Sequence, residues 1–193
     1  MSLAQDLRSL WSDADQLWAE FRRHSGPLFH HLVPADYTAV AAALRTLRPE
    51  AETFLEFGSG IGAITVAAAR LGYEAYGIEI DPWMVDRAEA LARKHEAPAT
   101  FARGSFVPVE FAYRVEQQAI DMPWLADGEP AYEELGMDLD DFDLIYAFPW
   151  PGQRELLEEL LQRHARPGAR FLSWDATEGI QVTPIRATEL DDW

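Results

Sequence analysis

Apolar positions along this chain recur with two periods, and the stretches that follow each period alternate. Near the N-terminus the apolar residues recur every three or four positions, which is the spacing of one helix face. From residue 52 onward, short apolar runs typical of buried strands alternate with longer helical patterns. Because strands that alternate with helices pair in parallel through right-handed crossovers, the pattern predicts an α/β fold with a doubly wound, mostly parallel sheet.

The expected elements follow from these periods. Two N-terminal helices are expected ahead of the sheet, at residues 3–23 and 36–47. The alternating part comprises, in chain order, strand 52–57, helix 61–71, strand 75–80, helix 82–96, strand 99–103, strand 142–147, helix 152–165 and strand 168–174. Open parallel sheets bind ligands at the carboxyl ends of their strands, so a site is expected in the turns that follow these strands.

A length of 193 residues supports one domain with a sizeable core. We expect residues 1–34 to form an N-terminal helix and cap segment, and residues 35–193 to form the single domain. An insertion at about 107–141 separates two of the strands, and its first apolar residues alternate with other types at Val107, Val109, Phe111, Tyr113 and Val115. This period of two predicts a half-exposed strand, which Pro108 confines to a sheet edge or a strand start. The rest of the insertion is interpreted as either a lid or a solvated loop.

The turn after the first strand carries the strongest chemical signal. Glu56 stands two residues before Gly58, and further glycines follow at Gly60 and Gly62, directly before a helical pattern. Glycine permits a sharp bend and leaves room for a ligand, and the free N–H groups of a helix start favour a polar or anionic group. Glu79 ends the second strand, 21 residues after Gly58, where a carboxylate can accept hydrogen bonds from both hydroxyls of a ribose. Together these residues predict a nucleoside-cofactor site.

Two kinds of nucleoside cofactor fit the glycines. Gly58, Gly60 and Ala63 satisfy the dinucleotide spacing G-x-G-x-x-A, so an NAD(P)-dependent dehydrogenase is one alternative. Glu56 favours S-adenosylmethionine instead. Its carboxylate would repel a pyrophosphate but suits the ammonium group of a methionine moiety.

Residues 56–62 resemble the first motif of the class I S-adenosylmethionine-dependent methyltransferases, an acidic residue followed by x-G-x-G-x-G. Residues 77–81 resemble the second motif of that family, with Glu79 as the ribose ligand. The resemblance spans about residues 30 to 175 and is closest to uncharacterised bacterial members. It implies a Rossmann-like fold, S-adenosyl-L-methionine as cofactor and methyl transfer as the activity. The cofactor-binding residues that it implies are Tyr37, Glu56, Gly58, Ser59, Gly60, Gly62, Glu79, Ile80, Ser105, Phe106 and Ala147.

In the resembled family the fourth strand ends beside the transferred methyl group, and amino-group methyltransferases there often show Asn or Asp, then Pro-Pro, then an aromatic residue. Here Trp150 keeps the aromatic residue, while Ala147 replaces the polar one and Phe148 replaces the first proline. Backbone carbonyls of Ala147 or Phe148 remain able to accept from an amine. We therefore expect Trp150 and Phe148 to act on the substrate side, with His31 as a candidate general base. The alternative for Trp150 is a hydrophobic plug in the turn.

Family members usually complete a seven-stranded sheet with an antiparallel hairpin after the fifth strand. Here residues 180–185 offer at most one strand after that point. The sheet is therefore either shortened at its C-terminal end or completed by the strand expected at 107–115.

Composition limits the partners. The chain has no cysteine, which excludes disulfides, thiolate metal sites and a cysteine nucleophile. No metal is expected, because Asp138, Asp140 and Asp141 lack the glycine and the terminal glutamate of an EF-hand. The net charge of −17 and the single lysine, Lys94, disfavour nucleic acid, whose phosphates require basic side chains. A small molecule or a protein is the expected acceptor.

Neither a signal peptide nor an 18-residue apolar run is present in the sequence, so we expect a cytoplasmic protein without a membrane partner. A homodimer is compatible with this assignment. An alternative from a different functional class is a catalytically silent cofactor-binding partner of another protein. The missing polar residue at Ala147 and the short C-terminus are compatible with that alternative.

Overall fold

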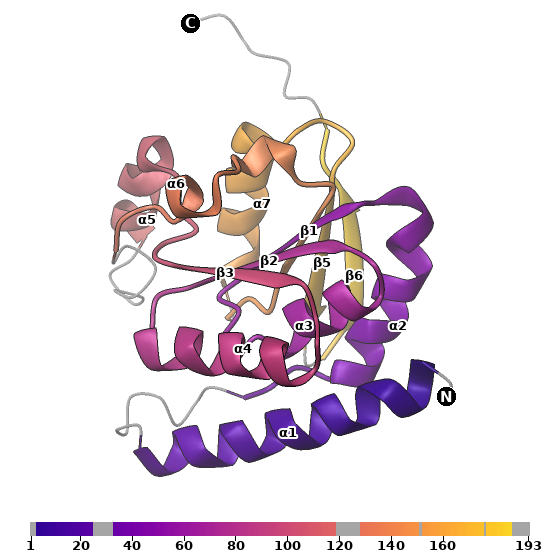
Figure 1. The fold of residues 1–193 in the computed structure, drawn as a ribbon. Helices are drawn as coiled ribbons and strands as arrows, with labels where there is room; N and C mark the ends of the chain where they lie inside the picture. Colours follow the sequence, from indigo (N-terminus) through magenta and orange to yellow (C-terminus); the bar gives the residue numbers. More distant parts are fainter. Residues whose placement is uncertain (1–2, 25–32, 119–127, 151, 176, 187–193) are drawn as a thin grey trace, which may run out of the picture.

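The computed structural model describes residues 3–24, 33–118, 128–150, 152–175 and 177–186. Its centre is a six-stranded sheet in the order β3-β2-β1-β4-β5-β6 (Figure 1). The strands are β1 (Thr53–Phe57), β2 (Glu74–Glu79), β3 (Ala99–Arg103), β4 (Leu144–Ala147), β5 (Arg170–Asp175) and β6 (Gly179–Pro184). The first five strands pair in parallel, and β6 pairs antiparallel with β5. The predicted α/β class with a mostly parallel sheet is confirmed, and the strand order changes direction between β1 and β4.

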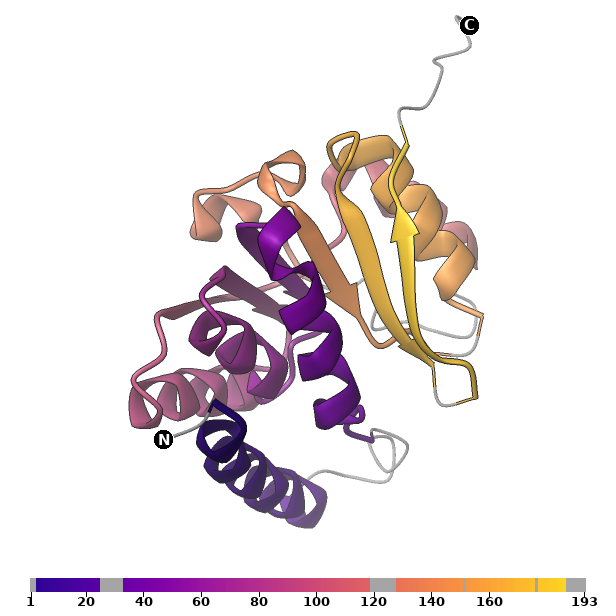
Figure 2. The ribbon, with the colours of Figure 1, turned by 90° about the vertical axis from the view of Figure 1, so that its right-hand side faces the viewer.

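Helices cover both faces of this sheet (Figure 2). They are α1 (Leu3–His24), α2 (Tyr37–Leu47), α3 (Ala63–Arg70), α4 (Pro82–Lys94), α5 (Ala112–Gln118), α6 (Tyr132–Leu135) and α7 (Arg154–His164), with short 3-10 turns η2 (Arg48–Glu50), η3 (Val109–Phe111) and η6 (Leu139–Asp141). Alternation along β1 divides the core, because Leu55 and Phe57 pack with α5, α6 and α7 on one face. Phe54 packs with α2 and α3 on the other face, and Glu56 bonds to α3 there.

The N-terminal helix α1 buries the apolar stripe that its sequence predicts. Leu7, Leu10, Ala14, Trp18 and Phe21 are buried against α3 and α4. Figure 1 shows α1 running beneath these two helices.

Ion pairs add to this packing. The Asp13 carboxylate on α1 lies 2.8 Å from both Lys94 Nζ and His95 Nε2 at the end of α4, and hydrogen bonding from Lys94 is the main reason that the pKa of Asp13 lies below its ordinary value. The Arg87 and Glu20 side chains form a second, looser pair at 3.4 Å.

Two helices begin where their sequences predict. Asp36 caps α2 by accepting from the backbone N–H groups of Thr38 and Ala39, both at 3.0 Å. Asp81 caps α4 in the same way, accepting from the N–H groups of Trp83 and Met84, and Pro82 occupies the first turn. Each cap satisfies backbone donors that a helix start leaves without partners, and so fixes the chain at the entrance of the helix.

The prediction of a strand at 107–115 is wrong. This segment forms η3 and then α5. The structure buries Val107, Phe111 and Val115, which are four residues apart, and leaves Val109 and Tyr113 exposed by 67% and 50%. A spacing of four is helical, and the period-two alternation concealed it because the intervening apolar residues happen to face solvent.

The structure also decides how the sheet is completed at its C-terminal end. Of the two alternatives, the shortened sheet is correct within the described residues, since β6 supplies one antiparallel strand and no described strand lies in the insertion. In that insertion, Asp138, Asp140 and Asp141 lie close together and exposed. Asp138 and Asp141 cap η6 reciprocally, so two of the three carboxylates already serve the backbone.

Candidate functional site

The three glycines after β1 all adopt left-handed backbone conformations. Gly58, Gly60 and Gly62 have φ values of 63°, 55° and 76°, a region that other L-residues rarely occupy. Their surroundings differ. A Cβ atom on Gly62 would lie 2.7 Å from Ala88 Cβ and from Phe101 Cζ, so close packing requires this glycine. A Cβ atom on Gly58 would have no atom within 4 Å, so Gly58 faces open space.

Gly60 faces a wall. A Cβ atom there would lie 3.6 Å from the Trp18 ring and 3.9 Å from Met84 Sδ. The N-terminal helix therefore borders the glycine loop through Trp18, a residue that the sequence indicated only as part of an apolar stripe.

Glu79 links the end of β2 to the glycine loop that follows β1. Its Oε2 accepts from Gly60 N–H at 2.8 Å, and its Oε1 accepts from Ile80 N–H at 2.8 Å and from Asp81 N–H at 3.0 Å. Burial raises the pKa of this carboxyl, and the three backbone donors oppose the rise. Since a carboxylate offers about four acceptor positions, Glu79 can hold the glycine loop and still accept from a ligand hydroxyl.

Glu56 lies buried beneath the start of α3. Its Oε2 accepts from Thr65 N–H at 2.9 Å and from Thr65 Oγ1–H at 2.5 Å. Burial raises the pKa of Glu56 to about 8, the two bonds from Thr65 oppose the rise, and the nearby charge of Glu79 adds to it. The sequence predicted the position of this carboxylate, whereas its bonds to Thr65 were not foreseen.

Among the described residues, three buried hydroxyls lack a hydrogen-bond partner, those of Tyr37, Ser59 and Tyr146. Tyr37 is the first residue of α2, and its ring stacks on Trp11 with 4.9 Å between centroids. Burial raises the pKa of Tyr37, and the nearby Trp18 indole opposes part of the rise. Tyr146 pairs in register with Glu56 across β4 and β1. Tyr146 was not among the predicted site residues, because it stands inside an apolar run that reads only as a buried strand.

The end of β3 carries Ser105 and Phe106. Ser105 is buried, and its Oγ accepts from Val107 N–H at 3.0 Å. Phe106 is half-buried and stacks on Phe57 with 4.5 Å between centroids. Ser105 also pairs with the insertion, since its N–H donates to Glu129 O at 2.8 Å.

The insertion returns to the site at this point. Pro130 forms a bridge with Ser105, and a Cβ atom on Gly128 would lie 3.2 Å from Ile80 Cδ1. The residues that follow Gly128 therefore line the ends of β2 and β3, which the sequence did not foresee.

The end of β4 leads into the turn that holds Trp150. Ala147 is buried, while Phe148 and Trp150 are half-buried. Trp150 N–H donates to Gln153 Oε1 at 2.9 Å, and Gln153 N–H donates to Trp150 O at 2.9 Å, so two reciprocal bonds fix the turn ahead of α7. His31 lies outside the described residues.

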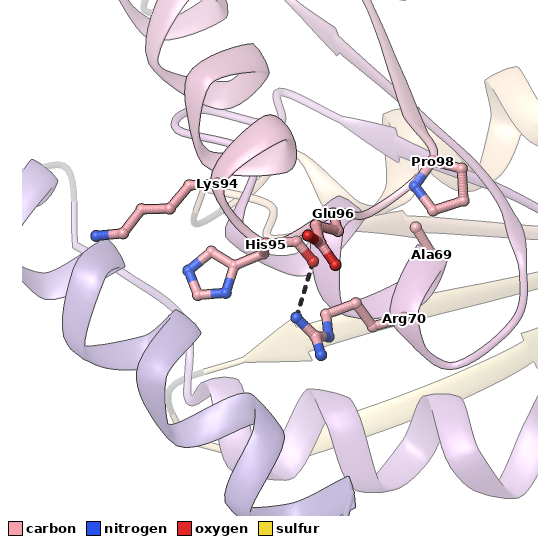
Figure 3. A pocket seen from close by; sticks show the side chains of 6 residues that line it. All are labelled: Ala69, Arg70, Lys94, His95, Glu96 and Pro98. Atoms are coloured by element: carbon pink, nitrogen blue, oxygen red, sulfur yellow. Dashed lines mark hydrogen bonds between the residues drawn. The ribbon is translucent and has the colours of Figure 1, made fainter.

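A hollow of about 380 Å³ lies elsewhere, at the ends of α3 and α4 (Figure 3). Its lining includes Arg70, which donates to the His95 carbonyl at 2.9 Å, and Lys94. These cations stand at helix C-termini, where positive side chains complement the helix dipole. The hollow is therefore separate from the cluster at the strand ends.

Comparison with known proteins adds to this geometry. Residues 55–127 match the family described as "Methyltransferase domain". The chain is 39% identical over 67 residues to ribosomal protein L11 methyltransferase of Thermus thermophilus, covering 35% of this chain and 26% of that protein. It is 32% identical over 124 residues to a Mus musculus lysine N-methyltransferase named for a subunit of ATP synthase, covering 62% and 49%. The matches thus span half or less of the length of these two relatives.

Among solved structures, an RNA methyltransferase from Salinibacter ruber in complex with S-adenosyl-L-homocysteine superposes with a TM-score of 0.58. The identity is 20%, with 83% of this chain and 98% of that chain covered. At this identity the likeness is one of fold.

Proposed function

We propose that this chain is a class I methyltransferase that transfers a methyl group from S-adenosylmethionine to a protein or a small molecule. The match of residues 55–127 to a methyltransferase domain and the likeness in fold to an RNA methyltransferase support the proposal. The observation that carries the proposal is the Glu79 carboxylate. It ends β2, bonds to the glycine loop after β1 and keeps acceptor capacity for the ribose hydroxyls of a nucleoside.

The residues at the strand ends fit this cofactor. Gly58 leaves open space at the loop, and Glu56 supplies a carboxyl group that can pair with the ammonium group of a methionine moiety. The buried, unpartnered hydroxyl of Tyr37 suits the carboxylate of a methionine moiety. Ser105 and Phe106 stand at the end of β3, where an adenine ring would stack and bond. The cofactor supplies a methyl group on a sulfonium, and these residues serve to position it.

The acceptor that we favour is a cationic side chain of a protein. The net charge of −17 attracts cationic partners, and the relatives named above are described as acting on ribosomal protein L11 and on a lysine of an ATP synthase subunit. Backbone carbonyls of Ala147 and Phe148 are the acceptors that we assign to an amine, with Trp150 and Phe148 beside it.

The experiment that tests the proposal is calorimetry with S-adenosylhomocysteine and with NAD, followed by transfer of labelled methyl from S-adenosylmethionine to fractions of a cell extract. Binding of S-adenosylhomocysteine together with a labelled fraction is expected. Heat with NAD alone would contradict the proposal and favour a dehydrogenase. Binding without transfer to any fraction would favour a silent partner protein.

We extend the proposal to location and assembly. Nucleic acid is disfavoured as a partner, because its phosphates would meet a chain with a net charge of −17. A cytoplasmic location and a possible homodimer complete the proposal. None of the described helices has the length and apolar content needed to cross a membrane.

Gly58→Ala should weaken binding of S-adenosylhomocysteine by about tenfold or more. Its methyl group would enter the open space beside the loop, and an alanine at φ 63° costs roughly 1 kcal/mol of stability. The matched control is Gly136→Ala at the end of α6, where φ is 65° and no atom lies within 4 Å of the added Cβ. Equal affinity for the two variants would show that Gly58 does not face the cofactor.

Trp150→Ala should reduce the rate of methyl transfer by about tenfold and leave cofactor affinity within about twofold, because we assign Trp150 to the substrate rather than to the cofactor. Trp150→Phe keeps an aromatic ring and should retain most of the rate. Single-turnover assays and calorimetry separate the two quantities. A parallel loss of rate and cofactor affinity would assign Trp150 to the turn rather than to the substrate.

A further inference from the structure

Polar groups crowd around Glu56 on the face of the sheet that α2 and α3 cover. Tyr146 is its cross-strand partner on β4, so the two side chains leave the sheet on the same face. Burial is the main reason that the pKa of Tyr146 lies well above its ordinary value, and Glu56 and Tyr37 add smaller electrostatic contributions. The three groups are therefore close enough to influence one another.

The Tyr146 hydroxyl needs an explanation. It is buried and has no partner among the described residues, although burying a hydroxyl without a hydrogen bond costs stability. Phenylalanine would fill the same space at no such cost, and Phe54 stacks on the Tyr146 ring in this same layer, with 6.5 Å between centroids. An unpartnered buried hydroxyl calls for an explanation, and a ligand-bound state of the protein supplies one.

Glu56 faces no positive group among the described residues. Those that face it are Thr65 from α3, Tyr37 from α2, Tyr146 from β4 and the like-charged Glu79 from β2. Asp15 and Arg22 on α1 interact with Tyr37 rather than with Glu56. Asp15 raises the pKa of Tyr37 and Arg22 lowers it.

From the residues that the structure describes, Glu56 accepts hydrogen bonds through only one of its two carboxylate oxygens. Both bonds from Thr65 go to Oε2. A carboxyl that is fully buried, close to another carboxylate and without a cation favours its neutral form, and burial accordingly raises the pKa of Glu56 to about 8.

We propose that Glu56 is a neutral acid in the free protein and loses its proton when the ammonium group of the cofactor arrives, and that Tyr146 is the positioning residue that then donates its hydroxyl hydrogen to the ionised carboxylate. This inference rests on the proposed function. The O–H bond of the carboxyl breaks, the proton passes to the buffer, and the ammonium group keeps its own protons. Glu56 then pairs with the ammonium, and the unpartnered Tyr146 hydroxyl acquires its acceptor.

Cofactor affinity should consequently rise with pH while Glu56 is neutral in the free protein. Each cofactor molecule displaces up to one proton, so the affinity for S-adenosylhomocysteine approaches a tenfold gain per pH unit between about pH 6 and 7.5. The gain ends as the pH passes about 8, where Glu56 is already ionised before the ligand binds.

The test is calorimetry of the full chain with S-adenosylhomocysteine at about pH 6.5, in phosphate and in imidazole, whose ionisation enthalpies differ. The difference in heat gives the number of protons released, and we expect about one for the unmodified protein. Glu56→Gln, which cannot ionise, should bind more weakly and release none.

Tyr146→Phe tests the positioning residue. Loss of its hydroxyl should raise the pH at which proton release begins, because the ionised carboxylate of the complex loses a donor. Thermal stability of the free protein should stay equal or rise, because an unpartnered buried hydroxyl is removed. Tyr73→Phe is the matched control, because the Tyr73 hydroxyl is also buried but already donates to Leu44 O at 2.7 Å. That variant should keep the wild-type proton count and lose stability.

The outcomes separate the inference from the proposed function. Binding of S-adenosylhomocysteine without proton release would overturn the inference and leave the function standing, whereas failure to bind would overturn both. A Tyr146→Phe profile identical to wild type would overturn the role of Tyr146. So would a loss of stability equal to that of Tyr73→Phe, since it would show that the hydroxyl has a structural partner such as a buried water.

Discussion

Replacing Glu79 by alanine should lower the affinity for S-adenosylhomocysteine by about 100-fold, or about 3 kcal/mol. Two effects contribute. The ribose hydroxyls lose a charged acceptor, and the backbone N–H groups of Gly60, Ile80 and Asp81 lose the carboxylate that now holds them. The glycine loop would therefore be displaced as well as deprived of its ligand contact. Isothermal titration calorimetry measures the change.

The control for this variant is Glu74→Ala, at the exposed start of the same strand. It removes the same charge from the net total but should leave the affinity within about twofold. Should Glu79→Ala bind as tightly as Glu74→Ala, the ribose would have to lie elsewhere, and the assignment of this edge of the sheet as a cofactor site would fail.

Replacing Glu56 by glutamine should make the ligand-free protein more stable than wild type at alkaline pH. The pKa of Glu56 rises from 4.5, its ordinary value, to about 8 in the folded protein, so folding favours the protonated form. An acid with a raised pKa gives its full contribution at low pH and loses it as the pH climbs from about 4.5 to about 8. Glutamine keeps the acceptor for Thr65 and carries no proton to lose.

The two proteins should therefore have similar free energies of unfolding at about pH 5, and the free energy of unfolding of the variant should be higher by roughly 5 kcal/mol at about pH 9. Urea unfolding at both values measures the gap, and the acidic arm is the internal control. A gap that stays constant across the range would show that Glu56 is ionised in the folded protein, with a cation or water beside it.

Much of the fold was predictable because its elements have distinct periods and clear ends. Helices were expected to start at residues 82 and 36, and α4 and α2 begin at or within one residue of these positions. The glycine loop was predictable for the same reason, since a positive φ at alternate positions leaves little choice of residue.

The insertion was not predictable in the same way. Between Val107 and Val115 the apolar residues satisfy a period of two and a period of four, and only the packing of η3 and α5 against the sheet decides which applies. A local pattern cannot settle such a case, because burial depends on elements far away in the sequence.

The residues of the candidate site also differ in how clearly the sequence points to them. Glu56 and Glu79 were predicted as cofactor-binding residues because each carboxylate stands beside or across from the glycine loop, and that role stays a prediction. Tyr146 and Thr65 were missed because each looks like an ordinary member of a strand or a helix. Their importance arises only when β1, β4 and α3 bring them to one carboxylate, which is a property of the sheet order rather than of any segment.

That sheet order also bears on how the chain reaches its native state. Strands β1, β2 and β3 are consecutive, so they can pair while the later part of the polypeptide is still being synthesised. The junction at the centre is different, because β1 must wait for β4. The bond between Thr53 N–H and the Asp143 carboxylate at this junction joins residues 90 positions apart. Closing so long a loop makes the β1–β4 pairing the slow, entropy-limited event, and the junction that brings Tyr146 beside Glu56 is completed only at the end of folding.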